Sequence, residues 1–315
     1  MRFAPKLALY ALILAWPFGF THAQDLAPRA YVIAPVHSNA VTLTYSFTDG
    51  GIFLNGAVPS TNTNGTIYTS VLTYFHTLSI FGRSANVTAS IPYGVGNFHG
   101  TVMSSETSVH RSGMIGVGIR FSVNLLGGPA MNLEGFHKWQ QKTILGVSLR
   151  VIPPNGQYDP TKLINLGVNR WAFKPELGYS RRWRSWLLDG YAGIWLFTRN
   201  LDYFSRNQFF AGTNTQSQGP IESFEGHLSY DFKPRLWASL DSDLWIGGQT
   251  SLNGVENTKT LQENSRIGTT LSVPVPKSKR QSLKFSYSRG AYVRFGADFQ
   301  VTSIAWQYSW LGRPN

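Results

Sequence analysis

Twelve segments of this chain share one pattern, in which apolar side chains alternate with polar or small ones at every step. In residues 115–125, the odd positions hold Ile, Val, Ile, Phe, Val and Leu, and the even positions hold Gly, Gly, Arg, Ser and Asn. Successive side chains of a β-strand point to opposite faces, so each segment predicts a strand with one apolar and one polar face. The segments are 40–49, 67–81, 85–95, 113–126, 142–152, 171–180, 185–198, 221–232, 235–248, 265–275, 281–289 and 298–310.

A soluble β-sandwich would alternate in the same way, so strand length and connections have to separate it from a membrane barrel. Most segments match the roughly 9–11 residues of a tilted transmembrane strand and exceed the mode of about five or six for soluble strands. Tight turns follow the second, sixth, eighth and tenth segments. Long polar loops follow most of the others, at 50–66, 96–112, 153–170, 199–220 and 249–264.

Short periplasmic turns, long external loops and an even strand number are typical of bacterial outer-membrane barrels. We therefore expect an all-β fold, an antiparallel up-and-down transmembrane β-barrel of twelve strands over residues 24–315. Both chain ends then lie in the periplasm. Residues 127–141 form a longer periplasmic link, which we expect to hold a helical turn.

The composition fits a chain with a lipid-facing surface. Only 14% of the residues are charged, about half the roughly 25% of a soluble domain. Because there is no cysteine, disulfide scaffolds, thiolate metal sites and cysteine nucleophiles are excluded. Aromatic residues gather at the strand ends, as in the two girdles of membrane barrels. They are Tyr179, Trp186, Tyr230, Phe232, Tyr308 and Trp310 near the inner rim, and Tyr45, Phe47, Tyr93, Trp171, Phe173 and Tyr287 near the outer rim.

The first 23 residues predict a secretory signal peptide. A short basic start is followed by an apolar run from Leu7 to Phe20 and by the small-x-small sequence Thr21-His22-Ala23. The run contains Pro17 and falls short of the roughly 20 residues that a membrane anchor helix needs. We expect cleavage after Ala23 and export to the bacterial outer membrane.

If the apolar parity of each strand meets lipid, the other parity faces the lumen and can line a solute pathway. The same charges could instead pair with one another as structural support across a filled lumen. Barrels of about eight strands are filled by side chains and those of about 16–18 leave a channel, so twelve strands permit both. The predicted pathway residues are Arg120, Arg150, Lys174, Glu176, Glu225, His227, Asp241, Asp243, Arg266 and Lys284, and the parity also places Lys142, Asp189 and Asp231 inside.

Two further features invite a functional interpretation. The loop 153–170, with Asp159, Lys162 and Asn165, could fold inward as a constriction or stay on the surface. His227 has a serine two residues on, at Ser229, and aspartates on the next strand, which are the residue types of a hydrolase. The more ordinary interpretation is that His227 takes part in a hydrogen-bond network of the lumen and has no catalytic role. The histidines show no metal-ligand spacing, so we expect neither an enzyme nor a cofactor.

Several stretches resemble the bacterial family named MetA-pathway of phenol degradation. They are "QDLAPRAY" (24–31), "KTILGVSLRVIPPNGQYDPTKLINLGVNRWAFKPELGYS" (142–180), "NSRIG" (264–268) and "WQYSW" (306–310). The resemblance implies an outer-membrane transporter linked to the catabolism of aromatic compounds, and it brings no catalytic residues. Five residues follow Trp310, whereas outer-membrane barrels often end on an aromatic residue.

We therefore expect a passive channel for small, aromatic compounds, and the alternative is a structural or adhesive barrel that acts through its outer loops. The expected partners are outer-membrane lipids and a small-molecule solute. The net charge of +12 would by itself suggest nucleic acid. However, ten of the cations fall in the predicted periplasmic connections, which suits anionic phospholipid headgroups, and we expect no nucleic-acid partner.

Overall fold

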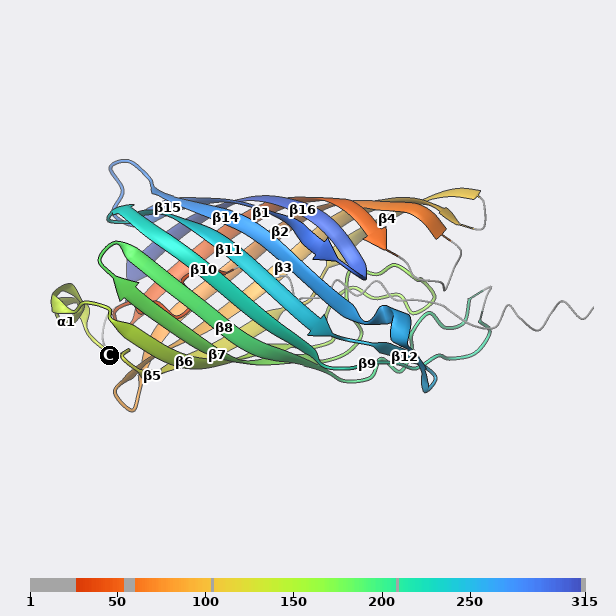
Figure 1. The fold of residues 1–315 in the computed structure, drawn as a ribbon, viewed down its shortest axis with the longest axis horizontal. Helices are drawn as coiled ribbons and strands as arrows, with labels where there is room; N and C mark the ends of the chain where they lie inside the picture. The colour runs from red at the N-terminus through yellow and green to blue at the C-terminus, as the bar shows by residue number, and fades with distance from the viewer. Residues whose placement is uncertain (1–26, 54–59, 103–104, 208–209, 313–315) are drawn as a thin grey trace, which may run out of the picture.

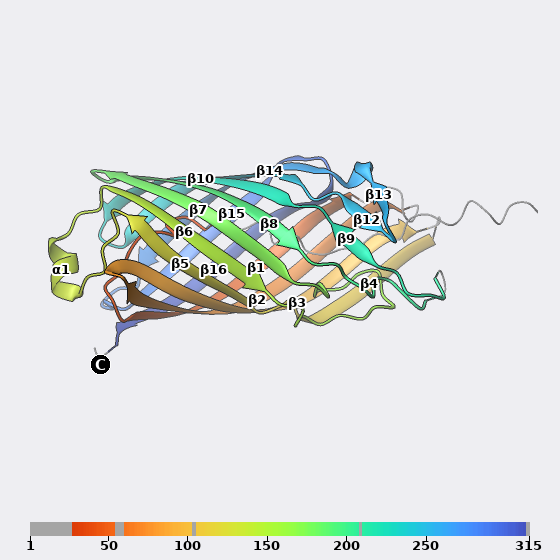
Figure 2. The same ribbon diagram turned by 90° about the horizontal axis from the view of Figure 1, so that it is seen from below.

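The computed structural model describes residues 27–53, 60–102, 105–207 and 210–312. The predicted signal peptide, residues 1–23, lies outside these ranges. The described strands form a closed antiparallel barrel of twelve strands (Figure 1, Figure 2). This confirms the predicted fold class and strand number.

Each barrel strand pairs with its neighbours in chain order, and the first and last strands pair with each other to close the barrel. One of the twelve positions is shared by two shorter strands, β4 and β5, which both pair with β3. In barrel order the strands are β1 (Ser38–Phe53), β2 (Ser60–Ile80), β3 (Arg83–Val102), β4 (Ser105–Met114) with β5 (Gly118–Leu126), β6 (Thr143–Ile152), β7 (Ala172–Trp183), β8 (Trp186–Phe197), β10 (Ile221–Lys233), β11 (Leu236–Gly247), β14 (Gln262–Pro274), β15 (Gln281–Val293) and β16 (Gly296–Leu311).

The first strands extend well beyond the predicted runs at the outer end of the barrel. β2 has 21 residues and β3 has 20, so much of the predicted loops 50–66 and 96–112 is strand. These extensions are rich in Asn, Thr, Gly and Ser, and they show no apolar parity. Outside lipid a strand needs no apolar face, because the backbone ladder alone can continue it. The alternation therefore marked the membrane-spanning part and not the whole strand.

The predicted single strand 113–126 is interrupted, which corrects that expectation. β4 ends at Met114, β5 begins at Gly118, and the break lies opposite Pro92, whose carbonyl accepts a hydrogen bond from the Ile115 amide (3.0 Å). Gly113 (φ 150°) and Gly116 (φ 145°) take backbone angles that other residues rarely adopt. A proline and two glycines at one level thus kink the wall.

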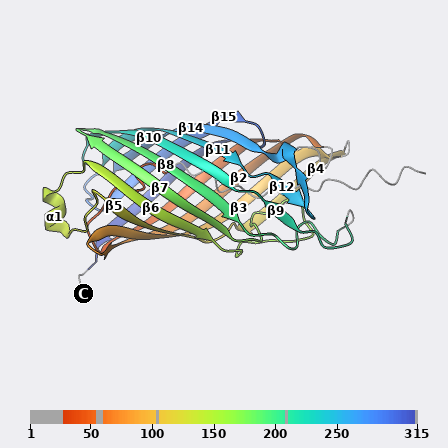
Figure 3. The same cartoon turned by 60° about the horizontal axis from the view of Figure 1, so that its bottom comes forward.

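The outer face of the barrel is an apolar belt, as the parity predicted. Large side chains such as Leu43, Leu72, Leu149 and Leu240 are exposed, and Figure 3 shows the tilted strands that carry this belt. Aromatic rings contact one another at both rims. Trp186–Tyr230–Phe232 and Trp306–Tyr308–Trp310 lie at the turn end, and Tyr45–Tyr68–Phe47 and Trp171–Phe173 lie toward the loop end.

Small elements cover the two ends. The periplasmic link holds α1 (Leu133–Lys138), the predicted helical turn, whose cap Asn132 accepts a hydrogen bond from the Gly135 amide (2.8 Å). At the other end β9 (Gln216–Gln218), β12 (Thr250–Leu252) and β13 (Val255–Asn257) form a small sheet next to the 3-10 turn Thr258–Thr260. Among the described residues, no helix has the length and apolar character to cross a membrane.

Candidate functional site

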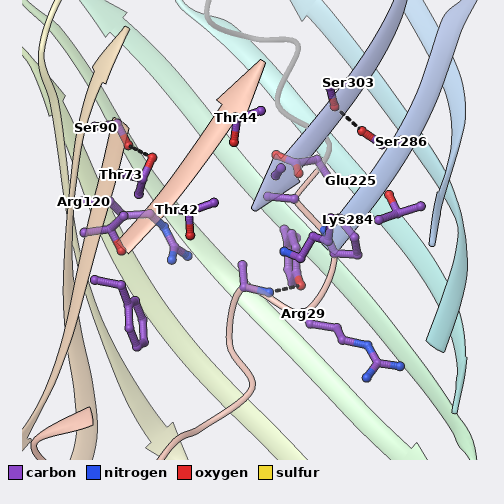
Figure 4. Close-up of a pocket in the computed structure, with 18 of the residues that line it drawn as sticks. Arg29, Thr42, Thr44, Thr73, Ser90, Arg120, Glu225, Lys284, Ser286 and Ser303 are labelled. Atoms are coloured by element: carbon purple, nitrogen blue, oxygen red, sulfur yellow. Dashed lines mark hydrogen bonds between the residues drawn. The ribbon is translucent and has the colours of Figure 1, made fainter. Parts of the chain in front are cut away.

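The inward faces of the strands enclose a cavity of about 620 Å³ (Figure 4). One side of it is lined by hydroxyl groups from neighbouring strands. Thr42 and Thr73 lie in register on β1 and β2, and Thr73 is hydrogen-bonded to Ser90 of β3 (3.2 Å). Ser286 of β15 and Ser303 of β16 make a similar pair (2.5 Å). Hydroxyl groups both donate and accept hydrogen bonds, so this side of the cavity can bind an anionic, a cationic or a neutral solute.

The opposite side carries charged side chains in register. Arg120 of β5 lies directly opposite Arg150 of β6, which in turn lies opposite Lys174 of β7. Lys174 Nζ contacts Glu176 Oε2 (2.8 Å) and Glu225 Oε1 (2.7 Å), and Arg120 Nη2 contacts Glu176 Oε1 (3.3 Å). These pairs are largely buried, so they hold their geometry in a medium where charge interactions are strong.

Most of the predicted pathway residues meet in this cavity. Seven of the ten line it, namely Arg120, Arg150, Lys174, Glu176, Glu225, Arg266 and Lys284. The other three, His227, Asp241 and Asp243, are buried on the inward face of β10 and β11 and do not line it. Asp189 and Asp231 also face inward, where the Arg29 amide and guanidinium contact them. Lys142 is exposed just before β6 begins and does not line the cavity.

The residues around His227 form a buried network of ion-pair and hydrogen-bond contacts. His227 Nδ1 lies 2.9 Å from Asp241 Oδ1, and its Nε2 lies 3.7 Å from Glu225 Oε2. The Thr270 hydroxyl donates to the second oxygen of Asp241 (2.8 Å). Ser229 Oγ is fully buried and has no hydrogen-bond partner among the described residues, so the histidine has no activated nucleophile beside it.

The segment before β1 lies inside the barrel at the end with the short turns, which is the end predicted to be periplasmic, and the sequence analysis did not anticipate it. Residues 27–30 and Val32 line the cavity. The Tyr31 side chain is 1% exposed, and its hydroxyl lies 3.0 Å from both Ser148 Oγ and Glu176 Oε1. Arg29 contacts Asp231 (2.8 Å) and stacks over the Trp237 ring at 4.1 Å. We refer to residues 27–37 as the plug segment.

Two glycines make room for the Tyr31 ring. Gly146 of β6 and Gly178 of β7 lie directly opposite each other and face inward. A Cβ atom on Gly178 would lie 2.0 Å from Tyr31 Cε2, and one on Gly146 would lie 2.6 Å from Tyr31 Cδ1. Only residues without a side chain therefore fit this socket. The pair of inward glycines in adjacent predicted strands was the one signal in the sequence that could have revealed it.

Above the cavity, the inner face of the barrel becomes apolar, which the parity rule also missed. One cluster joins inward residues of β6, β7, β8, β10 and β11, and a second joins those of β1, β2, β3 and β16. We call this layer the outer collar. It consists of Ile152, Ala172, Trp195, Ile221 and Trp245 in the first cluster, and of Ile52, Ile67, Phe98 and Phe299 in the second.

The loop 153–170 folds inward against this collar. Ile164 packs on the second cluster, and its carbonyl accepts a hydrogen bond from Arg111 Nε (2.7 Å). Asn165 is buried and bonds the backbone of Asp159. The Thr161 hydroxyl and the Lys162 ammonium bond the Asp159 carboxylate, which lowers the pKa of that group to about 2. Of the two readings left open for this loop, the structure shows the inward one.

The model of the family described as "Putative MetA-pathway of phenol degradation" matches residues 46–299. The chain belongs to this family. The resemblance noted in the sequence is thereby confirmed, and the matched range takes in almost every barrel strand. A comparison with curated proteins finds no match.

Among solved structures, an outer membrane channel from Pseudomonas putida F1 has a TM-score of 0.70 at 16% identity, covering 91% of this chain and 100% of that chain. The β domain of the Bordetella autotransporter BrkA has a TM-score of 0.50 at 12% identity, covering 87% and 100%. The transport unit of the autotransporter AIDA-I from Escherichia coli has a TM-score of 0.50 at 9% identity, covering 93% and 95%. At such identities these likenesses show the fold, which is that of outer-membrane barrels.

Proposed function

We propose that this protein is a passive channel of the bacterial outer membrane that admits small molecules, aromatic compounds among them. The observation that carries the proposal is the hollow lumen, a cavity of about 620 Å³ lined by hydroxyl and charged groups inside a twelve-strand barrel. A barrel with a purely structural role needs no such space. Membership of a phenol-degradation family supports an aromatic solute, and the Pseudomonas putida relative is itself described as a channel.

The lumen offers a graded route to such a solute. The side chains of the outer collar are buried, and they would face a solute only once the loop 153–170 shifts; their aromatic and aliphatic groups then favour an apolar ring. The cavity below it presents hydroxyls from β1, β2, β3, β15 and β16 and charges from β5, β6, β7, β10, β14 and β15. The plug segment lies at the periplasmic end and would have to shift for a solute to leave. In this proposal Arg120, Arg150, Lys174 and Lys284 line the pathway, and the protein acts without catalysis.

Maturation is part of the proposal. We infer that residues 1–23 are removed after Ala23 and that the mature chain begins at Gln24. N-terminal sequencing of protein extracted from outer membranes tests this directly. A chain that starts at Met1 would contradict it.

Solute uptake into proteoliposomes tests the function. Purified protein is first shown to be folded by its heat-modifiable migration on mild detergent gels, as expected of an outer-membrane barrel. Liposomes containing it are then compared with empty liposomes for uptake of phenols, aromatic acids and sugars. We expect faster entry of the aromatic solutes than of sugars. Folded protein that passes no solute would favour the alternative, a structural or adhesive barrel.

A further inference from the structure

The side chains that line the cavity carry more positive than negative charge, which bears on the charge of the solute. Six cationic and two acidic side chains line the cavity, which gives a net charge of +4 at neutral pH. Both carboxylates, Glu176 and Glu225, lie against Lys174, and Glu176 also contacts Arg120. The remaining lining cations are Arg29, Arg150, Arg266 and Lys284.

Four inward-facing acids outside the cavity lining, Asp189, Asp231, Asp241 and Asp243, equal this charge in number. Asp231 contacts Arg29, Asp243 lies in register with Arg266, and Asp241 is bonded by His227 and Thr270. Each carboxylate oxygen of Asp241 is therefore already engaged, one by the His227 imidazole and the other by the Thr270 hydroxyl. Lys284, on β15, makes direct contact with none of these acids.

Lys284 faces the cavity without an ion-pair partner. Among the described residues, no carboxylate lies within 4.0 Å of its ammonium, and its one ring contact is with Trp237, 5.9 Å away. Arg29 stacks on the same ring at 4.1 Å, so two cations flank one indole. Lys284 lies in register with Ala305 of β16, next to the hydroxyl pair Ser286 and Ser303 (Figure 4). An ammonium and two hydroxyls on the same inward face, two positions apart along β15, are groups that suit a carboxylate.

Neutral and inorganic solutes fit these features less well. A neutral phenol or hydrocarbon gains nothing from the Lys284 ammonium, and a fully hydrated inorganic anion gains nothing from the apolar outer collar, where it would lose water. An ionised aromatic carboxylate gains from both, because its ring suits the collar and its charge suits Lys284. Resting on the proposed channel function, we infer that the cavity selects small aromatic carboxylates as monoanions and that Lys284 binds the carboxylate.

Three isosteric solutes test the inference with the full-length folded protein. Uptake of benzoate, benzyl alcohol and benzylammonium into proteoliposomes is measured at pH 7. After the rate into empty liposomes is subtracted, we expect the protein-dependent entry of benzoate to be about tenfold faster than that of benzyl alcohol, and that of benzylammonium to be slowest. Equal rates for benzoate and benzyl alcohol would overturn the inference and leave the channel function standing. Passage of none of the three would overturn the channel function itself.

The role of Lys284 has its own readout in planar bilayers. Benzoate added to a chloride current should block it at saturating concentration, and Lys284→Gln should raise the half-blocking concentration about tenfold, the worth of one charge-assisted contact. Lys284→Arg should restore much of the block. The control is Lys138→Gln, an exposed lysine on α1 outside the lumen, which should change nothing. Unchanged block in Lys284→Gln, with heat-modifiable migration intact, would contradict the assignment.

Discussion

The socket of Tyr31 allows the plug segment to be released without altering the segment itself. In Gly178→Ala, the new Cβ would lie 2.0 Å from Tyr31 Cε2, a distance at which the ring cannot stay in place. Alanine also lowers the conformational entropy of the unfolded strand relative to glycine, which favours the barrel by about 0.5–1 kcal/mol. The substitution should therefore free the plug segment while the barrel remains folded.

The size of the effect follows from what Tyr31 loses. Its buried ring contributes about 1.5–3 kcal/mol, and each of its two hydroxyl hydrogen bonds contributes about 1 kcal/mol. Losing about 4 kcal/mol at about 1.4 kcal/mol per tenfold raises the population with a displaced plug roughly a thousandfold. A smaller increase is expected if the ring finds other contacts inside the lumen.

Trypsin reports this population, because Arg29 is itself a cleavage site that lies inside the barrel. The Arg29 side chain is held by Asp231 and Trp237, so the Arg29–Ala30 bond should be cut only when the segment leaves the lumen. Mass spectrometry follows the loss of everything before Ala30. The matched control is Gly190→Ala on β8, where an added Cβ meets nothing within 4 Å. Equal cleavage rates in Gly178→Ala, Gly190→Ala and the unaltered protein would refute the reasoning.

Three other predictions concern the lipid face, the buried network and the inward loop. Leu240→Arg, in the middle of β11 on the exposed face, should destabilise the barrel in lipid by about 2–4 kcal/mol, whereas Val255→Arg in the outer sheet should have little effect; urea unfolding in liposomes measures both. Asp241→Asn should cost about 3 kcal/mol by removing the carboxylate bonded to His227 Nδ1, and replacing both Asp241 and His227 should recover part of that loss. The pKa of Asp159 falls from 3.8 to about 2 in the folded loop, so its contribution to the stability of the loop is complete above about pH 4 and is lost as the pH drops through 2. Proteolysis at low pH should therefore cut the loop 153–170 faster than at neutral pH. Asp159→Asn should show the same faster cleavage already at neutral pH.

The barrel could be predicted from the sequence because lipid on one side and a polar lumen on the other impose a period of two on each spanning strand. The alternation of apolar and polar residues covers only the membrane-spanning part of each strand. It therefore located all twelve strands, missed the outer extensions of β2 and β3, and joined β4 to β5 across the kink at Gly116. The kink depends on Pro92 of the neighbouring strand, which is a pairing that no local pattern records.

The site was predicted in part for a related reason. Arg120, Arg150 and Lys174 follow from parity, because paired residues of adjacent strands face the same side. The plug segment does not follow, since residues around Pro28 form no regular element and Tyr31 meets Gly178 across 147 positions of chain. The outer collar does not follow either, because inward residues such as Trp195 and Trp245 are apolar where the rule expects polar ones.

The most direct test of the central claim is the single-channel conductance of the purified, heat-modifiable protein in planar bilayers, compared between the unaltered chain and Gly178→Ala. A hollow barrel narrowed by its plug segment predicts small or infrequent openings in the unaltered chain and larger, longer ones once the segment is displaced. If both proteins are folded and neither conducts, the lumen is not a pathway and the channel account is wrong.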